Sequence, residues 1–388
     1  MPEFLLLVLV PVAAWGGWWF ARNTLRRGEK KRNRLFSNQY FQGLNYLLNE
    51  QPDKAIQIFL EMAEVNEDTV ETHLALGSLF RRRGEVDRAI RLHQNIISKH
   101  SLNETQRMQA LLELGEDYMR AGLFDRAEKL FSELTERESL APSALRHLLD
   151  IYQQEKDWEN ALDIASKLEQ ATDDHMGVFM SHFCCELAES SLAQGKPEAA
   201  RKFLRRGRRH DPENVRAYFI SAGIAVHREQ YGEAMGIHEE IARLDPDYLP
   251  YLLEDYFDSA EKCGRQEHAR DKLEGWVKSG HGTSVVLKKA EFLEQDEGVE
   301  AAARFIVSEL RERPSVRGLD RLMALKQAGG PGIESGEEVL HNITRELLAS
   351  QSSYRCSNCG FSGHNHHWQC PSCKQWSTTR VIRSVLGE

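Results

Sequence analysis

The feature that most limits the fold of this 388-residue chain is a pattern that recurs about every 34 residues. In Thr72–Ile97, two amphipathic segments are joined by a turn at Arg83-Gly84. Gly77 in the first segment and Ala89 in the second are small, which lets two helices pack closely. The same kinds of position recur in five further copies, at Gly43, Tyr46, Ala55 and Phe59; Gly115, Tyr118, Ala127 and Phe131; Tyr152, Ala161 and Ala165; Ala188, Ala200, Leu204 and Pro212; and Ala222, Ala234, Ile241 and Pro246.

A helix-pair repeat of this length, with small, aromatic and terminal proline positions, is typical of a tetratricopeptide repeat (TPR) array. We therefore expect an all-α solenoid over 36–350, in which stacked helix pairs form a superhelix with a concave face. Such a face binds extended peptides or partner helices and carries out no chemistry of its own. The six clear repeats are expected at Phe36–Thr69, Val70–Asn103, Met108–Ala141, Pro142–His175, Ser181–Asn214 and Val215–Tyr248.

The pattern becomes less regular after the sixth repeat. Leu249–Gly282 keeps the repeat length, but His268 stands where a small residue is expected. Thr283–Val316 returns to the register, and Gly318–Ala328 with Gly336–Ala349 predicts a closing helix pair. We expect eight repeats and a ninth, degenerate pair.

The amino-terminal segment predicts a membrane anchor over residues 1–21. Phe4–Ala21 is nearly all apolar, and a helix of that length spans about 27 Å, close to the thickness of a bilayer core. The basic residues follow the apolar run, within residues 22–35, whereas a signal peptide carries them before it. A cleaved signal peptide and a buried core helix are the alternatives. With an anchor, the amino end is expected outside the inner membrane, in the periplasm, and the rest of the chain in the cytoplasm.

The net charge and the placement of the cysteines restrict the classes of protein to which the chain can belong. The net charge of −9 argues against a general nucleic-acid binder. Four of the seven cysteines are crowded into Cys356–Cys373, whereas Cys184, Cys185 and Cys263 fall within helical patterns. Cys184 and Cys185 are expected to be small core residues. This distribution favours a metal site in a reducing compartment over a disulfide framework.

Two C-x-x-C pairs near the carboxyl end predict that metal site, in a small domain over 351–388. The candidate ligands are Cys356, Cys359, Cys370 and Cys373, whose spacing can bring four thiolates to one tetrahedral centre. Gly360 can adopt a positive φ after the first pair, and Pro371 restricts the second turn. Zinc is favoured, although four thiolates also bind iron.

The residues around the cysteine pairs allow more than one role. The three histidines in the intervening loop can bind a second ion, or can face solvent or support the metal ligands: His364, His366 and His367. The neighbouring aromatic residues can stack on bases or supply the core of a small metal domain: Phe361, Trp368 and Trp376. We expect the histidines to face solvent or to support the metal ligands, and the aromatic residues to supply the core of the metal domain.

A second basic cluster, Arg201–His210, falls on the second helix of the fifth repeat. It is either a solvated helix face or a docking patch for an acidic partner or an anionic head group. The sequence lacks a phosphate-binding loop, a zinc-protease motif and a dinucleotide-binding motif. We find no catalytic constellation, so an enzyme is not expected.

The order of these parts resembles the lipopolysaccharide assembly protein B (YciM) family of Gram-negative bacteria. The resemblance covers the anchor, the TPR array and the ending C-x-x-C-G…W-x-C-P-x-C-x-x-W, which is similar to that family's rubredoxin-type metal domain. It implies metal ligation by the same four cysteines. It also implies an inner-membrane regulator of lipopolysaccharide synthesis that helps the membrane protease FtsH degrade the deacetylase LpxC.

Three other functions are also compatible with the sequence. A scaffold that couples lipopolysaccharide synthesis to export would bind other inner-membrane proteins of that system. A nucleic-acid binder would use the aromatic and basic residues of the metal domain and bind in a salt-dependent manner. An electron carrier of the rubredoxin kind would hold redox-active iron. The acidic balance of the array disfavours nucleic acid, and no motif for a partner flavin or haem accompanies the metal site.

Overall fold

A computed structural model describes Gln42, Asn45, Tyr46 and Lys54, and residues 69–100, 102–328, 335–385 and 387–388. The predicted anchor over 1–21, the basic segment over 22–35 and nearly all of the first repeat lie outside these residues. Among the helices that are described, none has the length and apolar character needed to cross a bilayer. The chain divides into two units, Met1–Glu155 and Lys156–Glu388, each with its own internal packing.

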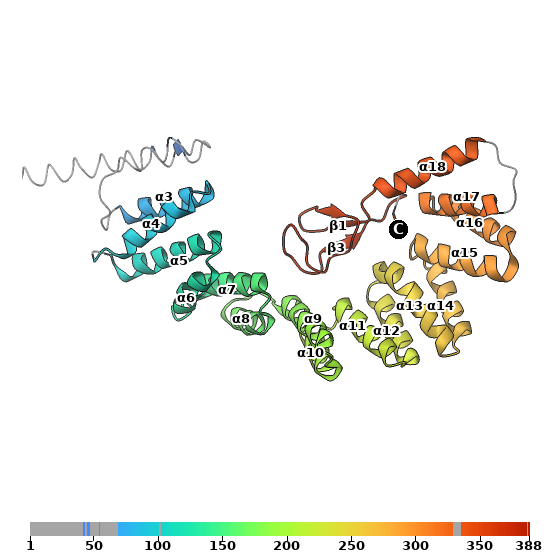
Figure 1. Cartoon of the computed structure of the whole chain (residues 1–388), viewed down its shortest axis with the longest axis horizontal. Coiled ribbons are helices and arrows are strands. Elements are labelled where there is room, and N and C mark those ends of the chain that lie inside the picture. Colours follow the sequence, from blue (N-terminus) through green and yellow to red (C-terminus); the bar gives the residue numbers. More distant parts are fainter. Residues whose placement is uncertain are drawn as a thin grey trace, which may run out of the picture. The chain divides into compact units, whose positions relative to one another are not determined.

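Consecutive α-helices build both units (Figure 1), and within each unit the helices that follow one another in sequence pack against each other. The first unit contains α3 (Val70–Arg82), α4 (Val86–Ile97), α5 (Glu104–Arg120), α6 (Phe124–Leu134) and α7 (Ala141–Glu155). The second contains α8 (Trp158–Ala171), α9 (Gly177–Ala193), α10 (Pro197–His210), α11 (Val215–His227), α12 (Tyr231–Leu244), the 3₁₀-helix η1 (Pro246–Tyr248), α13 (Leu249–Lys262), α14 (Gln266–Lys278), α15 (Thr283–Glu297), α16 (Val299–Glu312), α17 (Val316–Ala328) and α18 (Ser335–Ser350). The expectation of an all-helical repeat array is confirmed.

The turn in six of the described helix pairs follows one rule of spacing, whereas between α15 and α16 Gly298 precedes the buried Ala302 by four positions. A residue with positive φ precedes a fully buried alanine by five positions. The alanine lets the second helix approach the first, and the left-handed residue reverses the chain. The pairs are Gly84 and Ala89, Gly122 and Ala127, Lys156 and Ala161, Gly195 and Ala200, Glu229 and Ala234, and Gly264 and Ala269.

This rule corrects the expectation for the seventh repeat. Ala269 is fully buried, whereas His268 is exposed and its Nε2 lies 2.8 Å from Glu239 Oε1. The small position is therefore present, one residue later than a fixed period predicts. The cause is that α13 has 14 residues, whereas α11 of the preceding repeat has 13.

Close approach between paired helices explains the glycines of the first unit. A Cβ built on Gly77 would lie 2.2 Å from His93 Nε2, and one on Gly115 would lie 2.6 Å from the Phe131 ring. Helix α5 begins four residues before the expected repeat, because Asn103 caps it and accepts from the backbone N–H of Gln106 at 2.8 Å.

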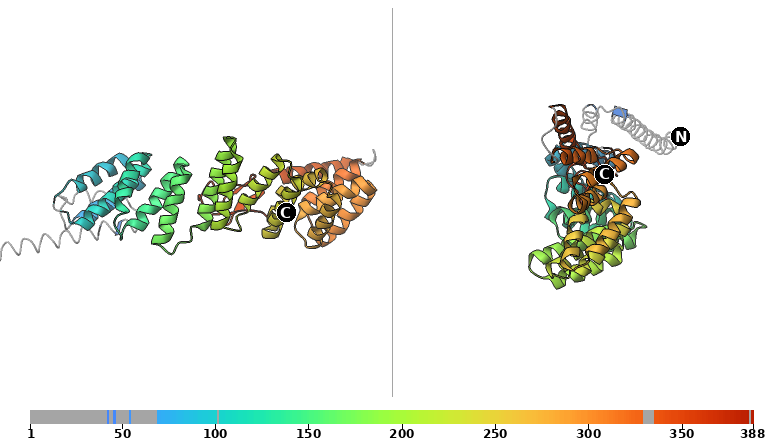
Figure 2. Two further views of the ribbon diagram at one scale, coloured as in Figure 1. Left: turned by 90° about the horizontal axis from the view of Figure 1, so that it is seen from below. Right: turned by 90° about the vertical axis from the view of Figure 1, so that its right-hand side faces the viewer.

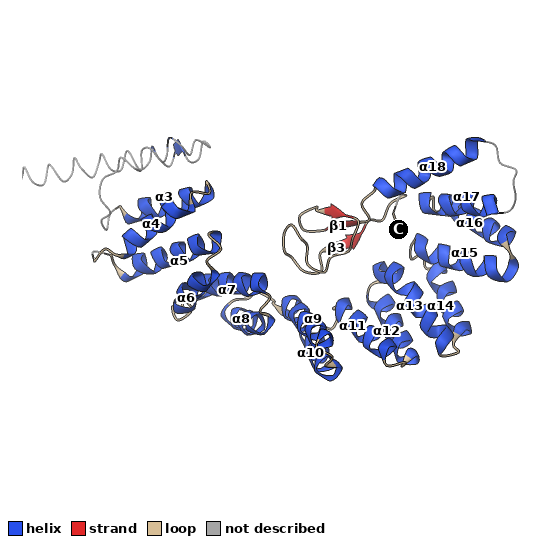
Figure 3. Ribbon diagram, viewed as in Figure 1, coloured by secondary structure: helices blue, strands red, loops and turns tan. Residues whose placement is uncertain are grey.

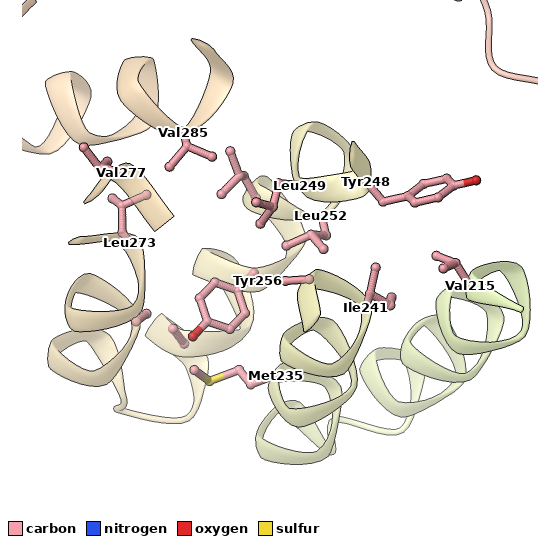
Figure 4. Packing of buried hydrophobic residues seen from close by; sticks show 14 residues of the cluster. Val215, Met235, Ile241, Tyr248, Leu249, Leu252, Tyr256, Leu273, Val277 and Val285 are labelled. Carbon is pink, nitrogen blue, oxygen red and sulfur yellow. The ribbon is translucent and has the colours of Figure 1, made fainter. Parts of the chain in front are cut away.

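Within each unit, neighbouring helices lie side by side (Figure 2) and bury clusters of apolar side chains between them. In the second unit, Tyr256 is fully buried between Met235 and Leu273 in a cluster that runs from α11 to α15 (Figure 4). Tyr248 lies at the edge of that cluster, and its ring points away from Leu249, Leu252 and Tyr256 (Figure 4). This ring is available to the segment that follows the repeats.

That segment forms a small antiparallel sheet (Figure 3). Its strands are β1 (Tyr354–Cys356), β2 (Ser362–Gly363) and β3 (Thr379–Val381), in the order β2-β1-β3. Tyr354 pairs with Gly363 on one side and with Val381 on the other. The sheet brings the two cysteine pairs together, because β1 ends at the first cysteine and β3 follows the last.

Candidate metal centre and its contacts with the repeats

Each cysteine pair lies in a tight turn of the same form. The backbone N–H of Gly360 donates to the carbonyl of Cys356 at 3.0 Å, and that of Lys374 donates to the carbonyl of Cys370 at 2.9 Å. Gly360 has φ 78° and Lys374 has φ 59°. The positive φ of Gly360 was predicted, but that of Lys374 was not, because lysine rarely adopts this conformation.

The four cysteine sulfurs gather at one point, all within 4.8 Å of one another. Cys356 Sγ lies 3.7 Å from Cys373 Sγ, and Cys359 Sγ lies 3.7 Å from Cys370 Sγ. Metal–sulfur bonds of about 2.3 Å in a tetrahedron place the sulfurs about 3.8 Å apart, whereas a disulfide needs about 2.05 Å. The arrangement therefore fits one metal ion, as the sequence predicts.

The thiols differ in how readily they lose a proton. The Thr378 hydroxyl, 3.3 Å from Cys356 Sγ, and the backbone N–H groups of Asn358 and Cys359 lower the pKa of Cys356 to about 6. Burial raises the pKa of Cys370 to about 11. A metal ion must displace that proton to bind, so its affinity is expected to fall in acid.

The intervening histidines do not share one role. His364 is exposed, as expected. His367 and Phe361 make an edge-to-face contact, with their ring centroids 6.3 Å apart. His366 differs from the expectation of a solvent-facing or ligand-supporting residue. It packs among aromatic rings and burial lowers its pKa to about 4, which keeps the imidazole neutral. Its neighbours are Tyr248, Tyr251, Tyr354 and Trp368.

Trp376 joins the metal domain to the fifth repeat. Its ring stacks on His182 of α9, with ring centroids 4.7 Å apart, and His182 Nε2 lies 2.7 Å from the Ser377 hydroxyl. Trp158 and Phe183 contact Trp376 edge-on. Only 5% of the Trp376 surface is exposed, so its indole is buried against the repeats and is unavailable to stack on a base.

Trp368 makes the equivalent contact with the sixth repeat. It stacks on Tyr248, with ring centroids 5.6 Å apart and ring planes inclined by 16°. Its ring centroid also lies 6.1 Å from that of Phe219 of α11. The prediction that the two tryptophans form the core of the metal domain is therefore incomplete, because they also form its contact with the repeats. Their partners His182, Phe219 and Tyr248 were not predicted, since the repeat pattern does not distinguish them.

Charged groups surround this aromatic contact. Arg380 pairs with Asp245, and Arg383 Nε donates to Asp247 Oδ1 at 2.8 Å. The Arg216 guanidinium lies over the Trp376 ring at 5.8 Å from its centroid. Glu186 and Glu189 are within 2.8 and 2.9 Å of Arg216, so this nearly buried cation is neutralised.

The other residues singled out in the sequence fall on α9 and α10. Cys184 and Cys185 are fully buried, and burial raises the pKa of their thiols to about 11 and about 12. Both are core residues, as predicted, whereas Cys263, at the end of α13, is only partly buried. Ala200, Leu204 and Gly207 are the buried face of α10, which directs the cations of Arg201–His210 to the other face.

The fold and the four-cysteine site define the class of the protein: a TPR array that carries a rubredoxin-type metal domain. The model of the rubredoxin metal binding domain matches residues 354–380. Tetratricopeptide repeat models match residues 72–105, 112–175 and 185–248.

Full-length relatives narrow the class to one family. Lipopolysaccharide assembly protein B of Escherichia coli (strain K12) is 35% identical over 385 residues, which cover 99% of each chain. The protein of the same name from Haemophilus influenzae is 33% identical over 396 residues, covering 97% of this chain and 98% of the relative. The chain therefore belongs to the lipopolysaccharide assembly protein B family.

Proposed function

We propose that this protein is a membrane-tethered adaptor that regulates lipopolysaccharide synthesis by promoting degradation of LpxC by FtsH. The observation that carries the proposal is the relationship to lipopolysaccharide assembly protein B over almost the whole chain. The resemblance noted in the sequence supplies the protease and the deacetylase as partners. The order of anchor, repeat array and metal domain supports a role at the inner membrane, with the array on its cytoplasmic side.

We infer that the protein acts by binding. The most buried cluster of titratable groups in the described part of the first unit supports this inference. His93 Nδ1 lies 2.5 Å from Asp117 Oδ2, both side chains are inaccessible to solvent, and Arg81 Nη1 donates to Asp117 Oδ1 at 2.7 Å. These contacts hold the three side chains together between α3, α4 and α5, where no substrate can reach the His93–Asp117 pair.

The metal is proposed to act through folding. Ligation by Cys356, Cys359, Cys370 and Cys373 would close the two turns of the metal domain, because binding free energy at such a site is folding free energy. The folded domain then presents Trp368 and Trp376 to α9, α11 and η1. In this proposal the repeats bind partners, the metal domain fixes the geometry of the repeats it contacts, and the tether raises the local concentration of membrane partners.

Site-specific cross-linking in intact membranes tests the proposal. A photo-reactive residue placed at Leu123 or Val178, exposed apolar positions, should capture LpxC, FtsH or both. The same residue at the buried Leu168 should capture neither and is the matched control. Capture of export proteins instead would favour the scaffold that couples synthesis to export. Capture of no protein of the lipopolysaccharide system would reject both functions.

A further inference from the structure

The residues after β3 lie against the concluding repeats as a bound peptide would. Arg383 pairs with Asp247 of η1, and the backbone N–H of Val316, the first residue of α17, donates to the carbonyl of Val385 at 2.8 Å. These contacts join the described residues 382–385 and 387–388, here called the tail, to η1 and α17. The tail also turns back on itself, because the backbone N–H of Gly387 donates to the carbonyl of Ser384 at 3.1 Å and that of Glu388 donates to the carbonyl of Ile382 at 3.2 Å.

The Glu388 carboxylate occupies a site that recognises one acidic side chain. It accepts from the backbone N–H of Ser284 at 3.0 Å and from the Ser284 hydroxyl, and it pairs with Arg317. The Ser284 N–H belongs to the first turn of α15, where backbone donors favour an anion. A Cβ on Gly282 would lie 2.9 Å from Glu388 Oε2, so the carboxylate approaches the backbone as closely as glycine permits.

A cavity of about 180 Å³ lies next to this carboxylate. Its lining includes the apolar residues Pro250, Val286, Ile306 and Leu310 of the repeats. The tail residues Arg383, Ser384 and Glu388 also line it. A dry cavity of about 150 Å³ holds a benzene molecule, so this one has room for an apolar side chain. Arg313 lines the cavity and has no ion-pair partner among the described residues, while Asp247 and Glu309 line it as well.

We propose that the Ser284–Arg317 site and the adjoining cavity, here called the tail groove, bind a peptide of a partner protein that carries a carboxylate side chain. The peptide would place a carboxylate on Ser284 and Arg317 and an apolar side chain in the cavity. The tail occupies this groove as an intramolecular ligand, which a partner peptide can displace. Because the tail is covalently attached, its effective concentration is in the millimolar range, and a free peptide must compete with it. The proposal is independent of which partners the repeats bind elsewhere.

Peptide binding to the full-length chain in detergent tests this groove. The probe is a fluorescein-labelled, carboxyl-amidated peptide of the tail sequence, Arg-Ser-Val-Leu-Gly-Glu, followed by fluorescence anisotropy. Glu388→Gln removes the charge of the intramolecular ligand, and we expect the probe to bind this variant at least about tenfold more tightly than the wild type. A probe that ends in Gln should lose this gain.

Changes on the groove side decide whether the contact is the proposed one. In the Glu388→Gln background, Arg317→Met should weaken probe binding at least about tenfold, because a charge-assisted contact to the carboxylate is lost. Arg304→Ala in the same background is the matched control, since Arg304 on α16 contacts only Glu300 at 3.7 Å in the described structure. Metal content and helical circular dichroism should be unchanged in all variants.

Two results would overturn the proposal. One is equal probe affinity of the wild type and Glu388→Gln, and the other is unchanged affinity after Arg317→Met. Neither result would bear on the adaptor function, which is measured by the lifetime of LpxC in cells.

Discussion

His182 and Trp376 stack with their ring centroids 4.7 Å apart and their planes inclined by 20°, and they join helix α9 to the metal domain. The Ser377 hydroxyl, 2.7 Å from His182 Nε2, fixes the orientation of the imidazole. The two sides of this contact are separated by 195 residues in the sequence. Through it, changes in the metal domain are expected to alter the stability of the fifth repeat.

Trp376→Ala should loosen this junction. Removing a large buried aromatic side chain typically costs about 3–5 kcal/mol. We expect faster amide hydrogen exchange along α9, near Phe183, while the four cysteines still bind metal at neutral pH. Phe361→Ala is the matched control, because Phe361 contacts His367 within the metal domain. Equal exchange along α9 in the two variants would contradict the proposed coupling.

Cys359→Ser and Cys373→Ser should each lose the metal, because a four-thiolate site needs every ligand. The metal domain should then unfold, and its aromatic side chains should no longer be ordered. The repeats distant from it should remain helical, since their stability comes from neighbouring helices. Elemental analysis and circular dichroism measure the two effects. Cys263→Ser, which changes a cysteine outside the metal cluster, is the control and should keep about one metal ion per chain.

The junction should weaken in acid. Burial, with the nearby Arg216 guanidinium, lowers the pKa of His182 to about 3, and burial lowers the pKa of His366 to about 4. Both imidazoles bind protons near pH 6.5 once they are exposed, so the exposed state takes up more protons. The stability they contribute is therefore complete above about pH 6.5 and is lost as pH falls toward 4 and then 3.

Unfolding of the metal domain followed between pH 7 and 5.5 measures this effect. His182→Phe keeps a ring against Trp376 but cannot titrate, so its stability should depend less steeply on pH. Metal content measured in the same samples separates this effect from loss of the ion. An identical pH dependence in the wild type and His182→Phe would show that His182 is not the titrating group.

Glu229→Gly should stabilise the sixth repeat. Glu229 has φ 60° in the turn between α11 and α12, where glycine stands in four of the other repeats that share this turn. The left-handed conformation costs a non-glycine residue about 1–2 kcal/mol, and the greater freedom of glycine in the unfolded chain offsets part of the gain. We expect a net gain of about 1 kcal/mol in chemical denaturation. Gly264→Ala, at the equivalent turn, should lower the free energy of unfolding. A lower free energy of unfolding in Glu229→Gly would contradict the spacing rule.

The repeats were predictable because burial recurs along the chain. Ala89, Ala127 and Ala161 are fully buried, and each lies in the second helix of its pair. A fixed period places the small residue of the seventh repeat at His268, one position too early, because it does not include the extra residue of α13. The rule that counts five residues from the turn identifies Ala269 correctly, since it follows the local geometry of the reversal.

The contacts of the metal domain were not predictable in the same way. The cysteine spacing predicts the site itself, because four thiolates at these positions can reach one centre. The partners of Trp368 and Trp376 come from surfaces of α9, α11 and η1, and no period relates them to the metal domain. The pairing of Glu388 with Ser284, 104 residues away, also depends on how the tail returns to the repeats.

The lifetime of LpxC tests the proposed adaptor function most directly. Pulse-chase labelling would follow LpxC in cells depleted of this protein and in cells supplied with either the full chain or a chain lacking Met1–Ala21. We predict a longer LpxC half-life after depletion, with excess lipopolysaccharide, full recovery with the complete chain and poor recovery without the predicted anchor. An unchanged LpxC half-life after depletion would contradict the adaptor function.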